Sequence, residues 1–191
     1  MSEKRQQLVE TAFKLFYRKG VHAVGINEIL AETGIAKKTL YHHFSSKSEL
    51  ISAVVTYRDE CFCCWIEGEL NKAKPGMARI DALFDALDDW FNDRAVALLP
   101  FRGCFFINVS GEYSNLEDPV HQQCLRHKDK IATLIKAQVS TLNIQADQIQ
   151  RLTDSLCLLK EGAIVLAHVQ GDRSAAQKAK LTAEILVKAY K

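Results

Sequence analysis

The side chains best suited to contact a polyanion gather in one short segment near the N-terminus. Residues 37–43 read KKTLYHH and carry ammonium, hydroxyl and imidazole groups. These groups donate hydrogen bonds to phosphate oxygens and base edges, and a Thr methyl can contact thymine. Leu40 and Phe44, four residues apart, take the buried side of a helix. The outer side then carries Lys37, Lys38, Thr39, Tyr41 and His42.

Two short helices with a glycine between them would hold this segment in place. Apolar residues at helical spacing predict a helix over Ile26–Thr33, which Gly34 ends, and a second one over Ala36–Phe44. Such a pair forms a helix-turn-helix, whose second helix enters the DNA major groove. The alternative is that the outer side chains only solvate the second helix.

Helical spacing recurs along the rest of the chain, and no stretch alternates as a strand does. The fold class is therefore expected to be all-α, with about nine helices. Ser46 and Glu49 have the capping-box spacing that starts a long helix. The expected helices cover residues 3–19, 26–33, 36–44, 46–73, 77–95, 102–114, 118–142, 146–169 and 173–190.

The composition is that of a globular chain. Of the 191 residues, 48% are hydrophobic and 25% are charged. No apolar run approaches the roughly 20 residues of a membrane span, and residues 1–10 contain no apolar stretch of a secretory signal. We therefore expect a cytoplasmic protein whose six cysteines are thiols. Residues 1–48 hold eight Lys and Arg against four Asp and Glu, a modest basic excess.

The run Gly34–Phe44, GIAKKTLYHHF, followed by SKSEL at 46–50, closely resembles the helix-turn-helix signature of the TetR family of bacterial transcriptional regulators. The segments 8–20 and 26–34 also fit that pattern. The resemblance implies a helix-turn-helix DNA-binding domain over residues 1–48 and a ligand-binding and dimerisation domain over residues 49–191. Gly25 stands where the family usually has Thr or Ser, so a hydroxyl contact to phosphate is missing there.

The resemblance implies a ligand-responsive transcriptional regulator, a repressor by family habit. A homodimer would bind a near-palindromic operator in double-stranded DNA, and a small-molecule inducer would release it. No cofactor, metal or membrane partner is expected. Tyr41 and Lys47 would contact phosphates. The candidates for the groove are Lys37, Lys38, Thr39 and His42.

The last two predicted helices carry the apolar residues that we expect at the dimer interface, although a core stripe has the same pattern. These residues are Leu152, Leu156, Leu159, Ala163, Leu166, Ala175, Ala179 and Leu186.

The inducer pocket is expected in the helices between the helix-turn-helix and the last two helices. Cys104, Asn108 and Glu112 are four residues apart and share one helical face. The Gly-Cys pair at 103–104 also resembles a branch of the family whose Cys senses electrophiles or oxidants. Cys104 is therefore open to three interpretations: a reactive thiol, a pocket wall or a core residue. The ligand candidates are Trp65, Phe91, Cys104, Phe105, Asn108 and Glu112.

The remaining chemistry-bearing residues do not form a recognisable catalytic or metal motif. Cys61, Cys63 and Cys64 do not share a helical face. His121, Cys124 and His127 are three residues apart, but no further ligand is placed by the sequence. No nucleophile elbow or phosphate-binding loop is present, so an enzyme is not expected. A helix-turn-helix that binds only protein is distinguished by the absence of salt-dependent DNA affinity.

Overall fold

The computed structural model describes residues 2–190, which are helical throughout except for turns and loops. The expected all-α class is confirmed, with nine α-helices and no strand in that range. The helices are α1 (Glu3–Lys19), α2 (Ile26–Thr33), α3 (Lys37–His43), α4 (Lys47–Asn71), α5 (Met77–Phe91), α6 (Phe105–Glu112), α7 (Pro119–Val139), α8 (Ile149–Val169) and α9 (Ala175–Ala189), with a short 3-10 helix at Ala146–Gln148 before α8.

The chain folds into two compact units. The first contains the chain up to Glu60 together with Cys104–His127, and the second contains Cys61–Gly103 together with the chain from Lys128. The first unit thus adds α6 and the start of α7 to the three N-terminal helices. The division predicted at residue 48 was drawn by function, and it stays a prediction.

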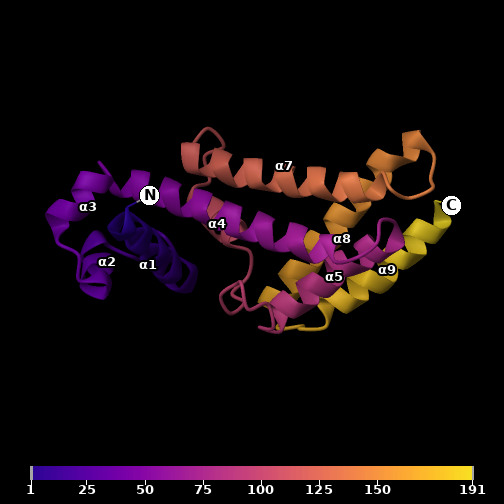
Figure 1. Cartoon of the computed structure of the whole chain (residues 1–191), viewed down its shortest axis with the longest axis horizontal. Helices are drawn as coiled ribbons and strands as arrows, with labels where there is room; N and C mark the ends of the chain where they lie inside the picture. Colours follow the sequence, from indigo (N-terminus) through magenta and orange to yellow (C-terminus); the bar gives the residue numbers. More distant parts are fainter. Residues whose placement is uncertain (1, 191) are drawn as a thin grey trace. The chain divides into compact units, whose positions relative to one another are not determined.

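In the first unit, α1 packs against α2 and α3, as seen at the indigo end of the ribbon (Figure 1). The apolar face of α1 supplies Leu8 and Phe16, while Leu40 and Phe44 close the same core from α3 and its end. The Arg5 guanidinium lies 4.9 Å from the centre of the Phe44 ring, a cation–π contact. These contacts fix the side of α3 that faces inward.

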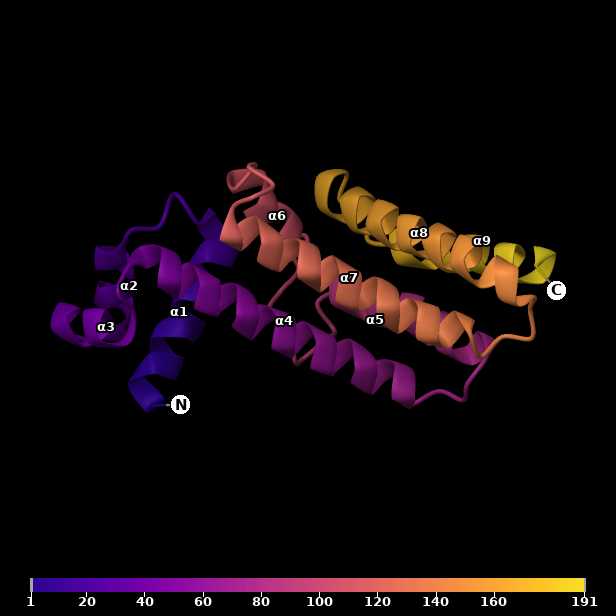
Figure 2. The ribbon, with the colours of Figure 1, turned by 90° about the horizontal axis from the view of Figure 1, so that it is seen from above.

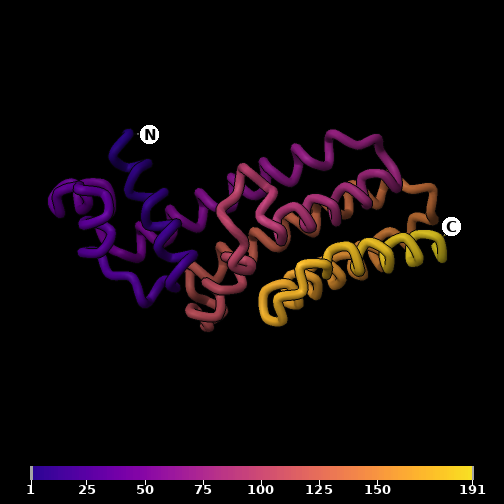
Figure 3. The backbone as a smooth tube through the Cα atoms, turned by 90° about the horizontal axis from the view of Figure 1, so that it is seen from below, coloured from indigo at the N-terminus to yellow at the C-terminus, as the bar shows by residue number. Residues whose placement is uncertain are grey.

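In the second unit, α9 lies along both α5 and α8 (Figures 1 and 3). The helix α8 follows α9 closely when seen from above (Figure 2). A cluster of rings fills the interior, with Trp90 in contact with Phe62, Trp65 and Phe101. Burial of these rings stabilises the second unit.

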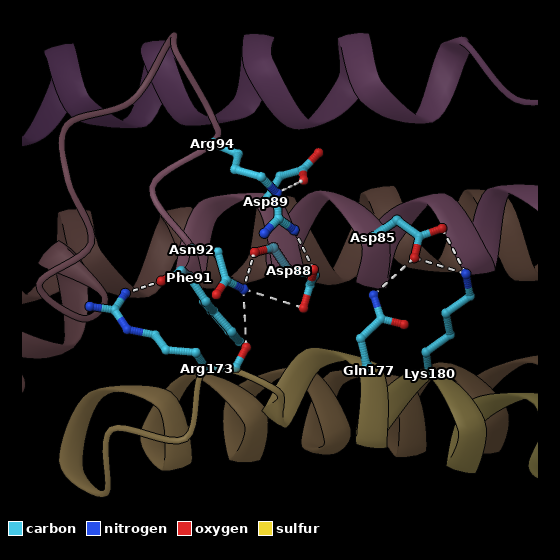
Figure 4. A network of polar contacts seen from close by, with 9 residues as sticks. All are labelled: Asp85, Asp88, Asp89, Phe91, Asn92, Arg94, Arg173, Gln177 and Lys180. Carbon is cyan, nitrogen blue, oxygen red and sulfur yellow. Dashed lines mark hydrogen bonds and ion pairs between the residues drawn. The ribbon is translucent and has the colours of Figure 1, made fainter.

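A polar seam joins α5 to α9 (Figure 4). Lys180 donates to both carboxylate oxygens of Asp85 at 2.8 and 2.7 Å, and Gln177 donates to the same carboxylate at 3.2 Å. Asn92 and Arg173 tie the end of α5 to the segment before α9 through main-chain oxygens. The seam fixes the register of α9 against α5.

Most of the later helices are shorter than predicted, and three of the differing ends have a clear local cause. The helix α5 stops at Phe91 instead of residue 95, because Asp93 adopts a left-handed φ of 59°. The helix α6 starts at Phe105 instead of residue 102, because Gly103 has φ of 81°. The ring of His168 fills the space that a side chain at Gly103 would need. The helix α8 is preceded by one 3-10 turn.

None of the helices within residues 2–190 combines the length and the apolar character needed to cross a membrane.

Candidate nucleic-acid interface

The helix-turn-helix of the first unit presents the polar face of α3 to solvent. Gly34 ends α2 with a left-handed φ of 68° and its N–H bonds the Leu30 carbonyl, so the chain turns sharply into α3. Leu40 and Phe44 are fully buried, which fixes the rotation of α3 about its axis. The opposite face exposes Lys37, Lys38, Tyr41 and His42, with Thr39 half-buried at its edge.

Two charged side chains hold the turn between α1 and α2 by hydrogen bonds to its main chain. The Lys47 ammonium donates to the Val21 carbonyl oxygen at 2.9 Å. The Glu112 carboxylate accepts from the main-chain N–H of Val21 at 2.7 Å and from that of His22 at 2.6 Å. Carboxylate bonds to main-chain N–H groups are charge-assisted and stronger than neutral ones. The turn that precedes the helix-turn-helix is therefore fixed by two side chains from α4 and α6.

This arrangement gives Lys47 and Glu112 roles that the sequence did not indicate. Lys47 was predicted to contact phosphate, and its ammonium is engaged with the turn, although two of its three N–H groups remain for other acceptors. Glu112 was predicted to line a ligand pocket, and its two carboxylate oxygens lie on the turn instead. His22 completes the site, with its ring 5.0 Å from the Tyr113 ring.

The start of α4 is capped as the spacing of Ser46 and Glu49 predicts, with one difference. The Ser46 hydroxyl accepts from the Glu49 N–H at 3.1 Å. The Glu49 carboxylate accepts from the N–H and the hydroxyl of Ser45, not from Ser46. These hydrogen bonds to the Ser45 hydroxyl and N–H lower the pKa of Glu49 below its ordinary value.

The other ligand candidates are accounted for by packing inside their own units. Trp65 packs beside Phe62 and Trp90. Phe91 contacts Phe101 at 4.8 Å between ring centres.

In the first unit, Phe105 meets the Phe13 ring edge-on at 5.2 Å. Cys104 is buried at the N-terminus of α6, and Asn108 is half-buried one turn later. None of the six candidates lines the groove between α8 and α9 or the cavity beside Lys128, Cys157 and Lys160 on α7 and α8.

The histidine stripe of α7 is engaged in other contacts. His121 donates its Nδ1 proton to the Tyr113 carbonyl at 2.6 Å, since a carbonyl only accepts. Buried His127 bonds the Asp59 carboxylate at 2.7 Å and stacks on the Phe106 ring at 3.5 Å. These contacts give both imidazoles a structural role, and the Asp59 partner was not predicted. None of the six cysteines forms a disulfide, and all six lie within residues 2–190.

A second unusual surface lies on α8 and α9 in the second unit. Large apolar side chains face solvent there, among them Leu158 at 75% exposure and Ile185 at 67%. A groove of about 480 Å³ runs between the two helices. Of the predicted interface residues, Leu152 and Leu156 are buried in the protomer's own core. The groove is lined by Leu159, Ala163, Leu166, Ala175, Ala179 and Leu186.

Comparison with known families and proteins gives a consistent result. Residues 8–54 match the family model described as bacterial regulatory proteins, tetR family, and residues 76–183 match a tetracyclin repressor-like C-terminal domain. An uncharacterized HTH-type transcriptional regulator of Mycobacterium tuberculosis, Rv0196, is 26% identical over 178 residues, which are 90% of this chain and 88% of that protein. FasR of Mycolicibacterium smegmatis, an HTH-type transcriptional activator, is 34% identical over 88 residues, covering 46% of this chain and 40% of its own.

Solved structures share the same fold. SCO4454 of Streptomyces coelicolor, a TetR-family transcriptional regulator, superposes with a TM-score of 0.86 at 24% identity, over 97% of this chain and 95% of that one. The reduced form of NemR from E. coli superposes with a TM-score of 0.82 at 18% identity, over 95% of each chain.

Proposed function

This chain belongs to the TetR family of DNA-binding transcriptional regulators, and we propose that it is a dimeric repressor that a small-molecule inducer releases from its operator. The observation that supports this proposal best is the exposed polar face of α3 on a buried apolar anchor. The functional division would follow the predicted one, with DNA binding in residues 1–48 and inducer binding and dimerisation in residues 49–191.

In the proposed complex, α3 lies in the major groove. Lys37, Lys38, Thr39 and His42 reach base edges, with lysine donating to guanine O6 and N7. Tyr41 and Lys47 contact phosphates beside the groove. The exposure of Tyr41, at 45%, is consistent with that contact, since its hydroxyl is available to donate.

A second copy of the chain is the proposed occupant of the α8–α9 surface. Exposed Leu and Ile side chains beside an apolar groove are typical of obligate homodimers. The proposed interface replaces the buried Leu152 and Leu156 by the exposed Leu158 and Ile185. It retains Leu159, Ala163, Leu166, Ala175, Ala179 and Leu186 of the predicted set.

A dimer would place two α3 helices in successive major grooves on one face of the duplex. The operator is then expected to be a near-palindrome whose half-site centres lie about 34–36 Å apart. An inducer would act by stabilising a conformation in which the two α3 helices no longer have that separation.

The first experiment selects fragments of the source genome that the full-length reduced protein binds at near-physiological salt. Recovery of one near-palindrome upstream of a few genes supports the proposal. A reporter assay with that site then reads whether expression rises or falls on deletion of the regulator, which distinguishes a repressor from an activator such as FasR. No enrichment, together with no salt-dependent DNA affinity, would overturn it.

A further inference from the structure

The helix α3 ends in two adjacent histidines, His42 and His43, whose surroundings differ. Their rings meet edge-on, with 5.2 Å between the ring centres. His43 is half-buried, and its Nε2 lies 3.4 Å from the Ser2 hydroxyl at the N-cap of α1. His42 is exposed and lies four residues after the exposed Lys38, which places both on one face of α3. His43 therefore belongs to the contact with α1, and His42 to the face proposed to enter the major groove.

His42 also differs from the histidines outside α3. The Nδ1 of His22 lies 3.3 Å from the Glu112 carboxylate. His121 bonds a main-chain carbonyl, and His127 bonds a buried carboxylate. Within residues 2–190, the His42 ring forms no hydrogen bond or ion pair and contacts only the neighbouring imidazole. The acceptor for a second N–H of His42 must therefore come from outside that part of the chain.

The carboxylates of the helices around α3 do not supply this acceptor. They belong to Glu3, Glu10, Glu28, Glu32 and Glu49. Three of them bond other side chains of the first unit, at 2.7, 2.5 and 2.7 Å respectively for Glu10, Glu28 and Glu49. The other two are exposed, where water screens their charge. A proton on His42 thus gains no carboxylate partner from these helices.

The other charged groups close to the pair in sequence or in contact with its neighbour are cations. The Arg5 guanidinium lies over the ring of Phe44, which follows the pair directly. Lys38 shares the exposed face of α3 with His42, and like charges four residues apart on a helix repel each other. DNA reverses this balance, because a duplex carries one phosphate charge for about every 1.7 Å of its axis.

The chemistry of imidazole couples such a contact to a proton. A histidine in ordinary surroundings changes its charge near neutral pH. Neutral imidazole has one donor and one acceptor nitrogen, whereas imidazolium has two donors. Phosphate oxygens and the O6 and N7 atoms of guanine only accept. An imidazole that meets these groups is therefore more favourable in its protonated form.

We propose that each protomer takes up a proton at His42 when α3 binds DNA, so that operator affinity rises as the pH falls from about 8 to about 6. The inference rests on the proposed function and adds the proton as a second ligand of the same surface. The sign follows from linkage: the complex binds more protons than the free protein, so lowering the pH favours the complex. His43 does not take part, because its ring is engaged with Ser2.

The test uses the full-length reduced protein and fluorescence anisotropy at a fixed salt concentration. The probes are the operator recovered by selection and a mixed-sequence duplex of about 30 base pairs, which spans three helical turns. Lysines and carboxylates in ordinary surroundings keep their charge between about pH 8 and about pH 6. We expect the Kd for each probe to fall at least about tenfold over this range, the effect of one proton held tenfold more tightly in the complex.

Calorimetry gives a second readout that does not depend on affinity. Binding is measured at neutral pH in two buffers that differ in their heat of ionisation. A difference between the two observed heats is expected, in the direction of net proton uptake by the complex.

Two variants of His42 test the residue in opposite directions. His42→Gln cannot be charged and is expected to bind at every pH as weakly as the parent does near pH 8. His42→Arg is always charged and is expected to bind at every pH about as tightly as the parent does near pH 6. His43→Gln, next to it on α3, and His22→Gln, outside α3, are the matched controls and are expected to keep the pH dependence of the parent.

The outcomes decide the proposal separately from DNA binding itself. Equal affinity at both ends of the pH range, or parental pH dependence in His42→Gln, would overturn it. Loss of the pH dependence in His22→Gln or His43→Gln would assign the proton to another ring and overturn it as well. Thermal melts at both pH values establish that each variant is folded. Failure to bind either duplex at any pH contradicts the proposed function, and with it this inference, whereas binding that ignores pH contradicts only this inference.

Discussion

Two exposed surfaces of this protein are both formed by helices but differ in chemistry: the outer face of α3 is polar, and the outer face of α8 and α9 is apolar. The α3 face presents ammonium, hydroxyl and imidazole groups around Tyr41. The α8–α9 face presents branched apolar side chains such as Leu158 and Ile185. A contiguous apolar surface favours another protein surface, whereas a cluster of donors favours phosphate and base edges.

The two faces also differ in how they are supported. A few charge-assisted bonds to main-chain atoms hold the turn before the helix-turn-helix, from Lys47 and Glu112. The helix α9 is held by extensive apolar packing and by the seam of Asp85 with Lys180. The turn before the helix-turn-helix is therefore held by few polar groups, and single substitutions of these groups are expected to have larger effects on operator affinity than on stability.

The largest expected effect comes from charging the apolar face. Leu158→Asp combined with Ile185→Asp would bury unpaired carboxylates in the proposed interface. We expect a monomer by sedimentation and a loss of operator affinity of about 100-fold or more, because the two α3 helices no longer bind as one unit.

Leu116→Asp is the matched control, because Leu116 is 65% exposed and lies outside that face. The Leu116→Asp variant is expected to remain dimeric by sedimentation. A dimeric double variant would show that the apolar face has another partner.

The second largest effect is expected when positive charge is removed from the exposed face of α3. Lys37→Met with Lys38→Met is expected to weaken operator binding at least about tenfold, since each lysine loses charge-assisted bonds to DNA. The dependence of affinity on salt should also become less steep where phosphate contacts are lost.

The control pair is Lys136→Met with Lys188→Met, two exposed lysines of the second unit. Operator affinity is measured by fluorescence anisotropy. If the α3 variant binds the operator as tightly as the parent does, DNA must bind to another surface of the protein.

The support of the α3 face is tested by Glu112→Ala. The N–H groups of Val21 and His22 lose their acceptor, and Val21 is buried, so the free energy of unfolding should fall by about 1–3 kcal/mol. Operator affinity should fall although the α3 side chains are unchanged.

Glu117→Ala, at an exposed position before α7, is the control. The free energy of unfolding of Glu112→Gln should lie between those of the parent and of Glu112→Ala, because the amide retains one acceptor oxygen. A thermal melt of Glu112→Ala identical to that of the parent would contradict the role given to this carboxylate.

The smallest effect concerns the support of α9. Burial raises the pKa of Asp81 above its ordinary value, despite the opposing effect of Lys180. Ionised Asp81 therefore costs the folded state stability at neutral pH, and that cost disappears as pH falls through the raised pKa. Asp81→Asn is expected to raise the melting temperature by about one or two degrees at neutral pH and by less in acid.

Asp85→Asn, one turn away, is expected to act in the opposite direction, since it weakens the ion pair with Lys180. Equal melting shifts for the two variants at neutral pH would contradict the difference between these two carboxylates.

The sequence predicted local features well where one signal decided them. The bounds of α1 and α2 match the prediction, because apolar spacing and the glycines at 20 and 34 act within a few residues. The side of α3 that faces inward followed from Leu40 and Phe44 alone. The end of α5 was missed, because no pattern indicates the left-handed Asp93.

The partners of charged residues could not be predicted in the same way. Glu112 reaches the turn at Val21 across 91 positions of sequence, and no local pattern marks such a pair. On α8, apolar residues occur on more than one side, so Leu152 and Leu156 were grouped with residues of the exposed face. No sequence pattern indicates that Lys160 is buried, and its ammonium donates to the neighbouring Glu161, which also accepts from distant Lys128.

The bonds of Glu112 to main-chain N–H groups have an evolutionary consequence. Every amino acid except proline offers the same N–H, so positions 21 and 22 can change side chain without loss of either bond. Substitution at 22, which is exposed, should be tolerated for nearly all residues, and proline alone should behave like the loss of Glu112. In hydrogen exchange, the His22 amide should be protected far beyond what its solvent-facing position suggests, and this protection should vanish in Glu112→Ala.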